Sequence, residues 1–378
     1  MSEATETVPA KPLPMPAQAL RPMQLAAVFG LFAAIALALY APALRGELVT
    51  DDVVYLTHNS YVRDLDPAKL VEILDPRGSP AMYVTNYSPL TLLLHAAQLA
   101  AFGAHWTAHH VVNVLLHALA CTLFAALLLR HGATRGSALG AAAVWLVHPA
   151  SVEAVAWISQ LKTLASMTLA LGALLALPRR TAAATVLFAL ALLAKAQALS
   201  ALPFVALWAW QERGRPAGAA RVGAPTVAVW CALAAGFLLA QLPPSLAGTA
   251  AAAPLHESLP LRALNIAVVG VRYVAMAATS WGVAAFQQPD VVESFASPWT
   301  PTVLVVHGAL AWRLVATLRA GAAEARFWLF ALASFGPVSQ VFPFQYPVAD
   351  RYLYFLAPGL FGAVALAVGP WLAGDARR

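Results

Sequence analysis

The sequence predicts an all-α polytopic membrane protein. Of its 378 residues, 61% are hydrophobic and 11% are charged, whereas soluble domains carry roughly 25% charged residues. Apolar runs of helix-spanning length recur to the end of the chain, which excludes a single soluble core. Each run is expected to be a helix, because backbone groups without hydrogen-bond partners are prohibitively costly in lipid.

Ten apolar runs, bounded by charged residues or by Pro and Gly, are expected to cross the membrane. They are 24–44, 108–129, 137–150, 162–178, 181–195, 197–211, 224–242, 300–318, 326–342 and 353–373. Two further runs, 88–104 and 263–285, would raise the number to eleven or twelve if they crossed. Segment 1–22 is expected to be a cytoplasmic tail. Segment 24–44 is too long for a signal peptide and should remain as an anchor.

The positive-inside rule decides between these topologies. When 88–104 and 263–285 lie in or along the outer face, all the short basic loops fall on the other side. Segment 88–104 is also short for a span and begins near Pro89, which suits the first turn of a helix. We expect it to be an interfacial helix in a long first outer loop, about 45–107, of one membrane domain, 23–378.

This topology gathers the unusual polar residues at the outer face, while the inner face has little beyond Arg. The gathered residues are Asp51, Asp52, Asn86, Tyr87, His95, His148, Glu153, Gln160, Lys162, Lys195, Gln197, Asp350, Arg351 and Tyr352. Such an asymmetry implies an active site at the outer membrane boundary.

Two adjacent carboxylates, Asp51 and Asp52, follow the first apolar run almost directly. Carboxylates beside a bilayer are costly to desolvate, and neighbouring ones repel, so one should hold a proton more tightly than a free Asp. The pair marks either a working site or an acidic, solvated loop. Glu153 has the same two interpretations, as a second carboxylate aimed at that site or as a solvated charge at a helix start.

Lys195 stands between two apolar runs and has no carboxylate nearby in the sequence. A lysine in that position either extends outward to water or meets an anion. Its predicted place at the outer face favours the anion. Arg351 lies beside Asp350, so a plain ion pair is the alternative to an anion site there.

Three polar residues, His110, Asn113 and His117, share one face of the second span. They could ligate a metal, but no Cys or carboxylate completes a ligand set on that helix. Hydrogen bonding between helices is favoured instead. Cys121 and Cys231 lie within apolar runs and are expected to pack there. No phosphate-binding glycine loop or serine nucleophile motif is found in the sequence.

Six short motifs together resemble a known family. In chain order they are Asp51-Asp52-x-x-Tyr55-x-Thr57-x-Asn59, Asn86-Tyr-x-Pro-Leu90, His110-x-x-Asn113-x-x-x-His117, His148-Pro-x-x-Val152-Glu-Ala-Val-Ala-Trp157, Leu193-Ala-Lys195 and Ala349-Asp-Arg-Tyr352. Between about residues 45 and 360 they are similar to the membrane part of the O-mannosyltransferase-like family that carries tetratricopeptide repeats. That family belongs to the GT-C superfamily, with the protein O-mannosyltransferases as relatives.

The resemblance implies a GT-C glycosyltransferase. Such an enzyme moves a sugar, mannose or another hexose, from a polyprenyl-phosphate carrier to an acceptor hydroxyl, such as that of a protein Ser or Thr, with inversion at the outer face. Asp51 matches the family's catalytic carboxylate, and Asp52 would orient the acceptor. The phosphate would be held by Lys195, Arg351 and Lys162. Contacts with the acceptor or sugar would come from Glu153, Asn86, Tyr87, His148 and Asn59.

The resemblance and the composition also imply partners and a location. The expected partners are a lipid-linked sugar donor and a protein or glycan acceptor, with no nucleic acid. No cofactor is expected, and the sequence leaves a divalent metal open. The abundance of Ala and Arg suggests a GC-rich bacterial genome, and hence an inner (plasma) membrane protein whose site faces the periplasm.

The chain also departs from the family pattern. It has Gln160-Leu-Lys-Thr163 where relatives commonly read Gln-Arg-Lys-Asp, so an Arg and an Asp are missing at Leu161 and Thr163. It carries no tetratricopeptide array before Arg378, so the acceptor-binding module is expected to be absent or supplied by another protein, and the chain to act on a different acceptor or to be a degenerate member. Two alternatives therefore stay open, a transporter or flippase for a lipid-linked anion and a catalytically inactive scaffold.

Overall fold

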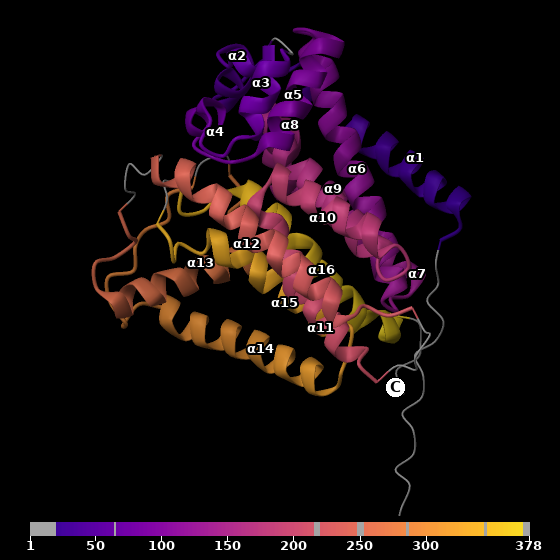
Figure 1. Ribbon diagram of the computed structural model, residues 1–378. Coiled ribbons are helices and arrows are strands. Elements are labelled where there is room, and N and C mark those ends of the chain that lie inside the picture. The colour runs from indigo at the N-terminus through magenta and orange to yellow at the C-terminus, as the bar shows by residue number, and fades with distance from the viewer. Residues whose placement is uncertain are drawn as a thin grey trace, which may run out of the picture.

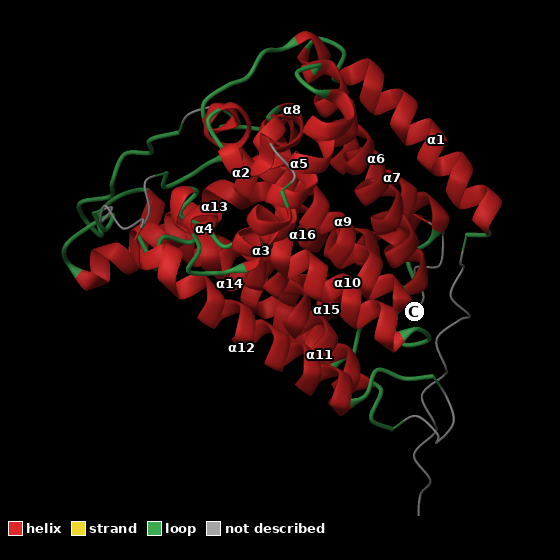
Figure 2. Ribbon diagram, turned by 45° about the horizontal axis from the view of Figure 1, so that its top comes forward, coloured by secondary structure: helices red, strands yellow, loops and turns green. Residues whose placement is uncertain are grey.

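A computed structural model describes residues 20–372 except 64–65, 215–219, 248–252, 285–286 and 344–345. Most of the expected cytoplasmic tail, 1–22, lies outside the described residues. The described chain is helical, with one isolated bridge between Gln287 and Val348, and Figure 2 shows helices joined by loops.

The described helices include long apolar helices and much shorter ones. Their bounds are α1 Pro22–Leu39, α2 Ser60–Arg63, α3 Pro67–Leu74, α4 Ser79–Tyr83, α5 Pro89–Phe102, α6 Trp106–Arg130, α7 Arg135–Val147, α8 Val152–Ala156, α9 Leu161–Ala176, α10 Thr181–Ala194, α11 Ala201–Gln211, α12 Ala224–Ala247, α13 Leu259–Thr279, α14 Trp299–Arg319, α15 Glu324–Phe335 and α16 Asp350–Leu372. The short helices α2 to α5 and α8 gather at one end of the bundle (Figure 1). We call α2 to α5 and their loops the outer cap.

Seven of the described helices are long and apolar enough to cross a membrane, so the chain is a multi-pass membrane protein. They are α1, α6, α9 with the turn before it, α12, α13, α14 and α16. An eighth crossing is present if α7 and the following segment Pro149–Ala156, bent by 58° relative to each other, form one span.

The expected number of ten spans is therefore not reached by helix length. Segments 181–195, 197–211 and 326–342 contain α10, α11 and α15, which have 14, 11 and 12 residues, whereas a crossing takes about 20. α10 stops because Lys195 has an extended backbone, and α15 stops at the 3-10 turn Gly336–Val338. The break at Lys195 coincides with the expected boundary between 181–195 and 197–211, whereas the break after Phe335 lies within an apolar run and was not expected.

The two ambiguous runs take different forms. α5 has only 14 residues, which agrees with a helix that lies at the interface. α13 has 21 residues and passes the length test for a span, in contrast to the expected placement along the outer face. Its contacts nevertheless tie it to the outer starts of two other helices. The Tyr273 hydroxyl accepts from the amide of Ala349, just before α16, and the Arg272 guanidinium lies 4.9 Å from the ring of Trp299, the first residue of α14.

The core lies around α6, which packs against α1, α7 and α9. His117 of α6 joins three helices there. One ring nitrogen is 2.9 Å from the Tyr354 hydroxyl of α16, and the other is 3.1 Å from the Leu146 carbonyl of α7. Polar side chains that bond between helices in this way stabilise bundles in membranes. α1 and α14 lie at opposite sides of this core (Figure 1).

A close contact fixes α16 on α15. A Cβ atom at Gly359 would lie 2.5 Å from the Ala331 amide nitrogen, and one at Gly362 would lie 2.3 Å from the Phe327 ring. Only glycine therefore allows the two backbones this approach, as small residues do at many membrane helix interfaces.

Polar side chains also join the helices at the end opposite to the outer cap. The buried Arg326 of α15 lies 2.8 Å from a ring nitrogen of His131, after α6, and donates to the Gln211 amide oxygen of α11 at 2.6 Å. Its guanidinium also lies over the ring of Trp208.

The topology can be tested with single cysteines in a Cys231→Ser background. We expect Ser60→Cys and Ser79→Cys, both exposed in the outer cap, to react with an impermeant thiol reagent on intact cells. Gly136→Cys and Gly214→Cys lie in open space and should react only after lysis. Labelling of Gly136→Cys from outside would show that the assigned orientation is wrong.

Candidate functional site

Lys195 occupies the junction between α10 and the 3-10 turn Ala196–Ser200. Its extended backbone ends α10 and directs the side chain toward α9, where the ammonium donates to the Thr163 hydroxyl at 2.7 Å. Only 9% of the residue is exposed. Among the described residues, no carboxylate lies within 4 Å of this ammonium. A buried lysine is thus held by one neutral oxygen.

Two more cations lie near Lys195. Lys162 and Arg351 are both close enough to interact electrostatically with it, as is the carboxylate of Glu153. We call Lys162, Lys195 and Arg351 the cationic cluster. The ammonium of Lys162 donates to the Tyr55 hydroxyl at 3.1 Å and lies 4.5 Å from the centre of that ring. Both contacts favour a positive charge without neutralising it.

Arg351 is paired with Glu153, which comes from α8, 198 residues earlier in the chain. The guanidinium and the backbone amide of Arg351 each donate to a different oxygen of Glu153. The rings of Trp157, Tyr346 and Tyr352 lie 4.9–5.3 Å from the guanidinium carbon. Glu153 is therefore neither a solvated charge nor a second free carboxylate, because its oxygens are bonded to Arg351.

The two adjacent aspartates have different environments. Asp52 is fully buried and accepts hydrogen bonds from the amides of Val49 at 3.0 Å and Ser159 at 2.7 Å. Burial raises the pKa of the Asp52 carboxyl, the bonds from Val49 and Ser159 oppose that shift, and the charge of Asp51 adds to it. Asp51 is exposed. Of the pair, only Asp51 is open to an incoming molecule, so the expected role of Asp52 in orienting an acceptor has no geometric support.

Trp157 connects the aspartate loop to the cationic cluster. Its indole N–H donates to the Val49 carbonyl at 3.1 Å, while its ring lies 5.3 Å from the Arg351 guanidinium carbon. The loop continues as a π-helical turn, Val53–Thr57, a form often found at functional sites. This turn places Tyr55 against Lys162. The exposed carboxylate and the cations therefore belong to one site at the end of the bundle that carries α2 to α5.

Other residues expected at the sugar or acceptor have structural contacts instead. Asn59 accepts from the amide of Tyr61, Tyr87 donates to the Leu74 carbonyl, and His148 accepts from the amide of Ala150. Asn86 is half-buried after α4. Within the described residues, none of these four side chains forms a hydrogen bond or ion pair with the cationic cluster.

The polar face of α6 makes contacts between elements. The Asn113 amide donates to the carbonyls of Trp157 and Ile158, so it supports the segment that carries the site. His110 lies against Gly46, and His117 bonds as described above. Within the described residues, no group of three or more His, Cys, Asp or Glu side chains could hold a metal ion.

Several residues of the site were missed by sequence reasoning. Tyr55, Tyr346 and Thr163 contact the cationic cluster, yet a single Tyr or Thr gives no signal in an apolar sequence. A clearer signal was present in α5, where polar residues recur at helical spacing in an otherwise apolar run. They are Ser88, Thr91, His95 and Gln98.

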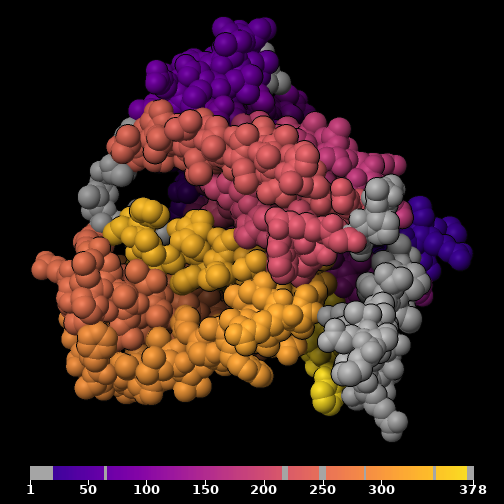
Figure 3. Space-filling model, turned by 60° about the horizontal axis from the view of Figure 1, so that its bottom comes forward, coloured from indigo at the N-terminus to yellow at the C-terminus, as the bar shows by residue number. Residues whose placement is uncertain are grey.

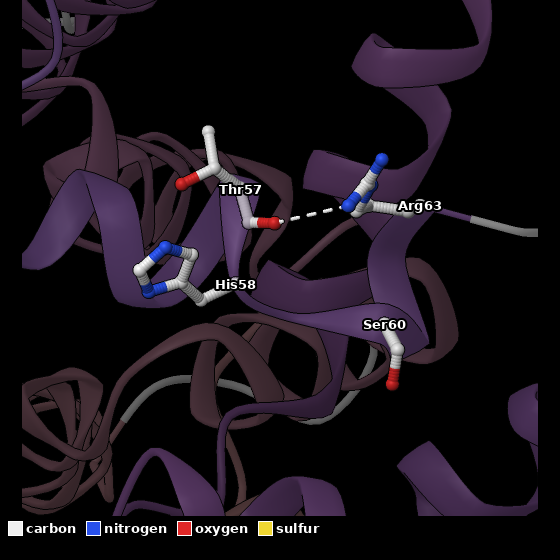
Figure 4. A pocket seen from close by; sticks show the side chains of 4 residues that line it. All are labelled: Thr57, His58, Ser60 and Arg63. Atoms are coloured by element: carbon white, nitrogen blue, oxygen red, sulfur yellow. Dashed lines mark hydrogen bonds between the residues drawn. The ribbon is translucent and has the colours of Figure 1, made fainter.

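Two openings lie at the surface. A pocket of about 480 Å³ in the outer cap is lined by Thr57, His58, Ser60 and Arg63, and the Arg63 guanidinium donates to the Thr57 carbonyl (Figure 4). Figure 3 shows a hollow between the salmon residues of α12 and the golden residues around the start of α16. The hollow therefore opens on the side of the bundle where α16 begins.

Fold and site define a multi-pass membrane protein with two lysines and an arginine gathered at one end of its bundle. Comparisons with protein-family models, curated proteins and solved structures found no match to this chain. The function is therefore inferred from the geometry of the site.

The different environments of the two aspartates predict different stabilities. Asp52→Ala leaves the buried amide of Ser159 and the amide of Val49 without acceptors, which should lower the free energy of unfolding by about 1–3 kcal/mol. Asp51→Ala, the matched control, should stay within about 0.5 kcal/mol of wild type. Unfolding of both variants in detergent measures the difference. Equal losses would show that Asp51 is also structural.

Proposed function

We propose that this protein is a glycosyltransferase that uses a polyprenyl-phosphate hexose as donor. The observation that carries the proposal is the buried Lys195, held by one hydroxyl and flanked by Lys162 and Arg351. Burial lowers the pKa of the Lys195 ammonium, and Lys162 and Arg351 add to the shift, so an anion is needed beside Lys195 to keep it in the charged form. Glu153 is bonded to Arg351, so the compensating charge is expected from a ligand.

A phosphate attached to a lipid suits this position. The cationic cluster lies at the ends of apolar helices, so a hydrocarbon carrier can stay in the bilayer while its phosphate reaches the charges. In glycosyl transfer, negative charge develops on the phosphate as the sugar departs. Cations fixed in place stabilise that charge without reorganising, and no general acid is needed for such a leaving group.

Asp51 is the proposed general base. The acceptor hydroxyl transfers its proton to Asp51 while its oxygen forms a bond to the anomeric carbon. The bond from that carbon to the phosphate oxygen breaks, and the phosphate leaves with the electron pair, so the configuration inverts. Asp51 is exposed and belongs to the loop that Trp157 links to Arg351, so a base and a leaving-group site are joined through one side chain.

The departures from the family pattern bear on the donor site. Thr163 accepts from Lys195 where relatives commonly carry an acidic residue, so no carboxylate at position 163 neutralises Lys195. Leu161 is buried in the core and supplies no charge. The proposed acceptor is a protein Ser or Thr or a glycan, presented by a separate protein at the periplasmic face of a bacterial inner membrane.

The base is tested by Asp51→Asn, which removes the proton acceptor without opening a cavity. Turnover should fall by about two to four orders of magnitude, while donor affinity should hardly change. Glu47→Gln, at an exposed carboxylate four residues earlier, is the control and should retain activity. Transfer of label from a radiolabelled polyprenyl-phosphate hexose by the purified protein is the measurement. Unchanged turnover in Asp51→Asn would remove Asp51 from the mechanism.

The phosphate site is tested by Lys195→Met, which keeps the apolar stem but removes the charge. Both donor affinity and turnover should fall, because the charge acts on the bound phosphate and on the transition state. Lys69→Met, in the outer cap, is the matched control. A transporter would also lose lipid binding in Lys195→Met, so donor cleavage decides. Wild-type protein that binds the donor but never cleaves it would favour a transporter or an inactive scaffold.

A further inference from the structure

A buried polar stripe runs along α5. Ser88 precedes the helix, and Thr91, His95 and Gln98 follow at intervals of three, four and three residues, so all four lie on one face. The exposed fractions of these residues are 1%, 0%, 0% and 8%. Apolar residues surround the stripe in sequence, and an interfacial helix would ordinarily turn its polar face to water. Here the polar face is turned inward.

Most of the stripe lacks partners in the protein. The Ser88 hydroxyl, both ring nitrogens of His95 and the amide oxygen of Gln98 are buried without a hydrogen bond. Buried polar groups are almost always bonded, because leaving them unpaired costs stability. Ser88, His95 and Gln98 therefore present several hydrogen-bonding groups on one helix face that a ligand could bind.

The stripe faces the proposed donor site. The Thr91 hydroxyl donates to the carbonyl of Ala194 at 3.0 Å, and Ala194 directly precedes Lys195. The ring of His95 lies 6.0 Å from the ring of Tyr55, whose hydroxyl accepts from Lys162. The positive charge of Lys162 also acts on His95. α5 therefore forms a wall next to two members of the cationic cluster.

His95 is neutral at physiological pH. Burial lowers its pKa to about 3, and the nearby His109 and Lys162 add to the shift. A neutral imidazole has one N–H donor and one nitrogen acceptor. A sugar hydroxyl likewise donates and accepts, and a ring with several hydroxyls can bond to side chains spaced along a helix.

We propose that the buried polar stripe of α5 recognises the hydroxyl groups of the hexose carried on the lipid phosphate. This inference rests on the proposed function and adds the part of the site that selects the sugar. The unpaired atoms are enclosed, so the hexose reaches them when α5 moves away from Tyr55 and from the end of α10. The sugar then bonds to Ser88, His95 and Gln98, while its phosphate stays at the cationic cluster.

The test compares two lipids, polyprenyl-phosphate hexose and sugar-free polyprenyl phosphate, binding to the purified full-length protein in nanodiscs. Wild type should bind the glycosylated lipid at least tenfold more tightly. His95→Phe should lose about tenfold of that preference and keep its affinity for the sugar-free lipid. His58→Phe, at an exposed histidine of the outer cap, is the matched control and should keep the preference.

Stability separates recognition from a structural role. Replacing an unpaired buried imidazole by an apolar ring of similar size should leave the apparent melting temperature equal or higher. A lower melting temperature together with an unchanged lipid preference would overturn the proposal. Wild-type protein without any preference for the glycosylated lipid would overturn it too, while leaving the phosphate site intact. Failure to bind either lipid would overturn the proposed function as well.

The movement of α5 can be tested by a disulfide. Thr91→Cys with Ala194→Cys, in a Cys231→Ser background, joins the positions linked by the hydrogen bond between α5 and α10. The oxidised protein should lose the preference for the glycosylated lipid and regain it on reduction, whereas Thr91→Cys alone should not respond to the oxidant. Full preference in the oxidised protein would show that α5 need not move.

Discussion

The ammonium of Lys195, buried at the end of an apolar helix, is the constraint on which the outer half of this protein depends. Removing an ammonium from water costs several kcal/mol unless other charges or dipoles replace the solvent. Here one hydroxyl does so, from Thr163. Glu153, a carboxylate that interacts electrostatically with Lys195, is bonded to Arg351. Lys162, Lys195 and Arg351 are therefore kept close to one another by the surrounding residues, although their charges repel.

Each neighbouring element is arranged around that charge. The ring of Tyr55 faces Lys162, and three aromatic rings surround Arg351. Aromatic faces attract cations yet carry no net charge, so the ring of Tyr55 holds Lys162 in place without neutralising it. Arg351 is paired with Glu153 in addition to its aromatic contacts. Thr163, which is uncharged, holds Lys195 by a hydrogen bond alone.

The sequence predicted those features that depend on composition and local spacing. Multi-pass architecture and the short helix α5 followed from hydropathy and from the position of Pro89. The boundary between 181–195 and 197–211 likewise anticipated the break at Lys195, whereas the pairing of Glu153 with Arg351 could not be predicted, because it depends on a contact between distant segments. Asp51 and Asp52 show the limit clearly. They are adjacent in sequence, yet only the fold determines that Ser159 bonds to one of them.

The close approach of α15 and α16 has a consequence for catalysis. Gly359 and Gly362 bring the two backbones together so tightly that α16 has little freedom to slide or rotate on α15. Arg351 is at the start of α16, so its backbone position is tied to the packing of α16 on α15. A guanidinium that is already in position needs little reorganisation free energy when charge develops beside it. In the proposed reaction the electrostatic part of the site is then preset, and conformational adjustment is confined to the wall that meets the sugar.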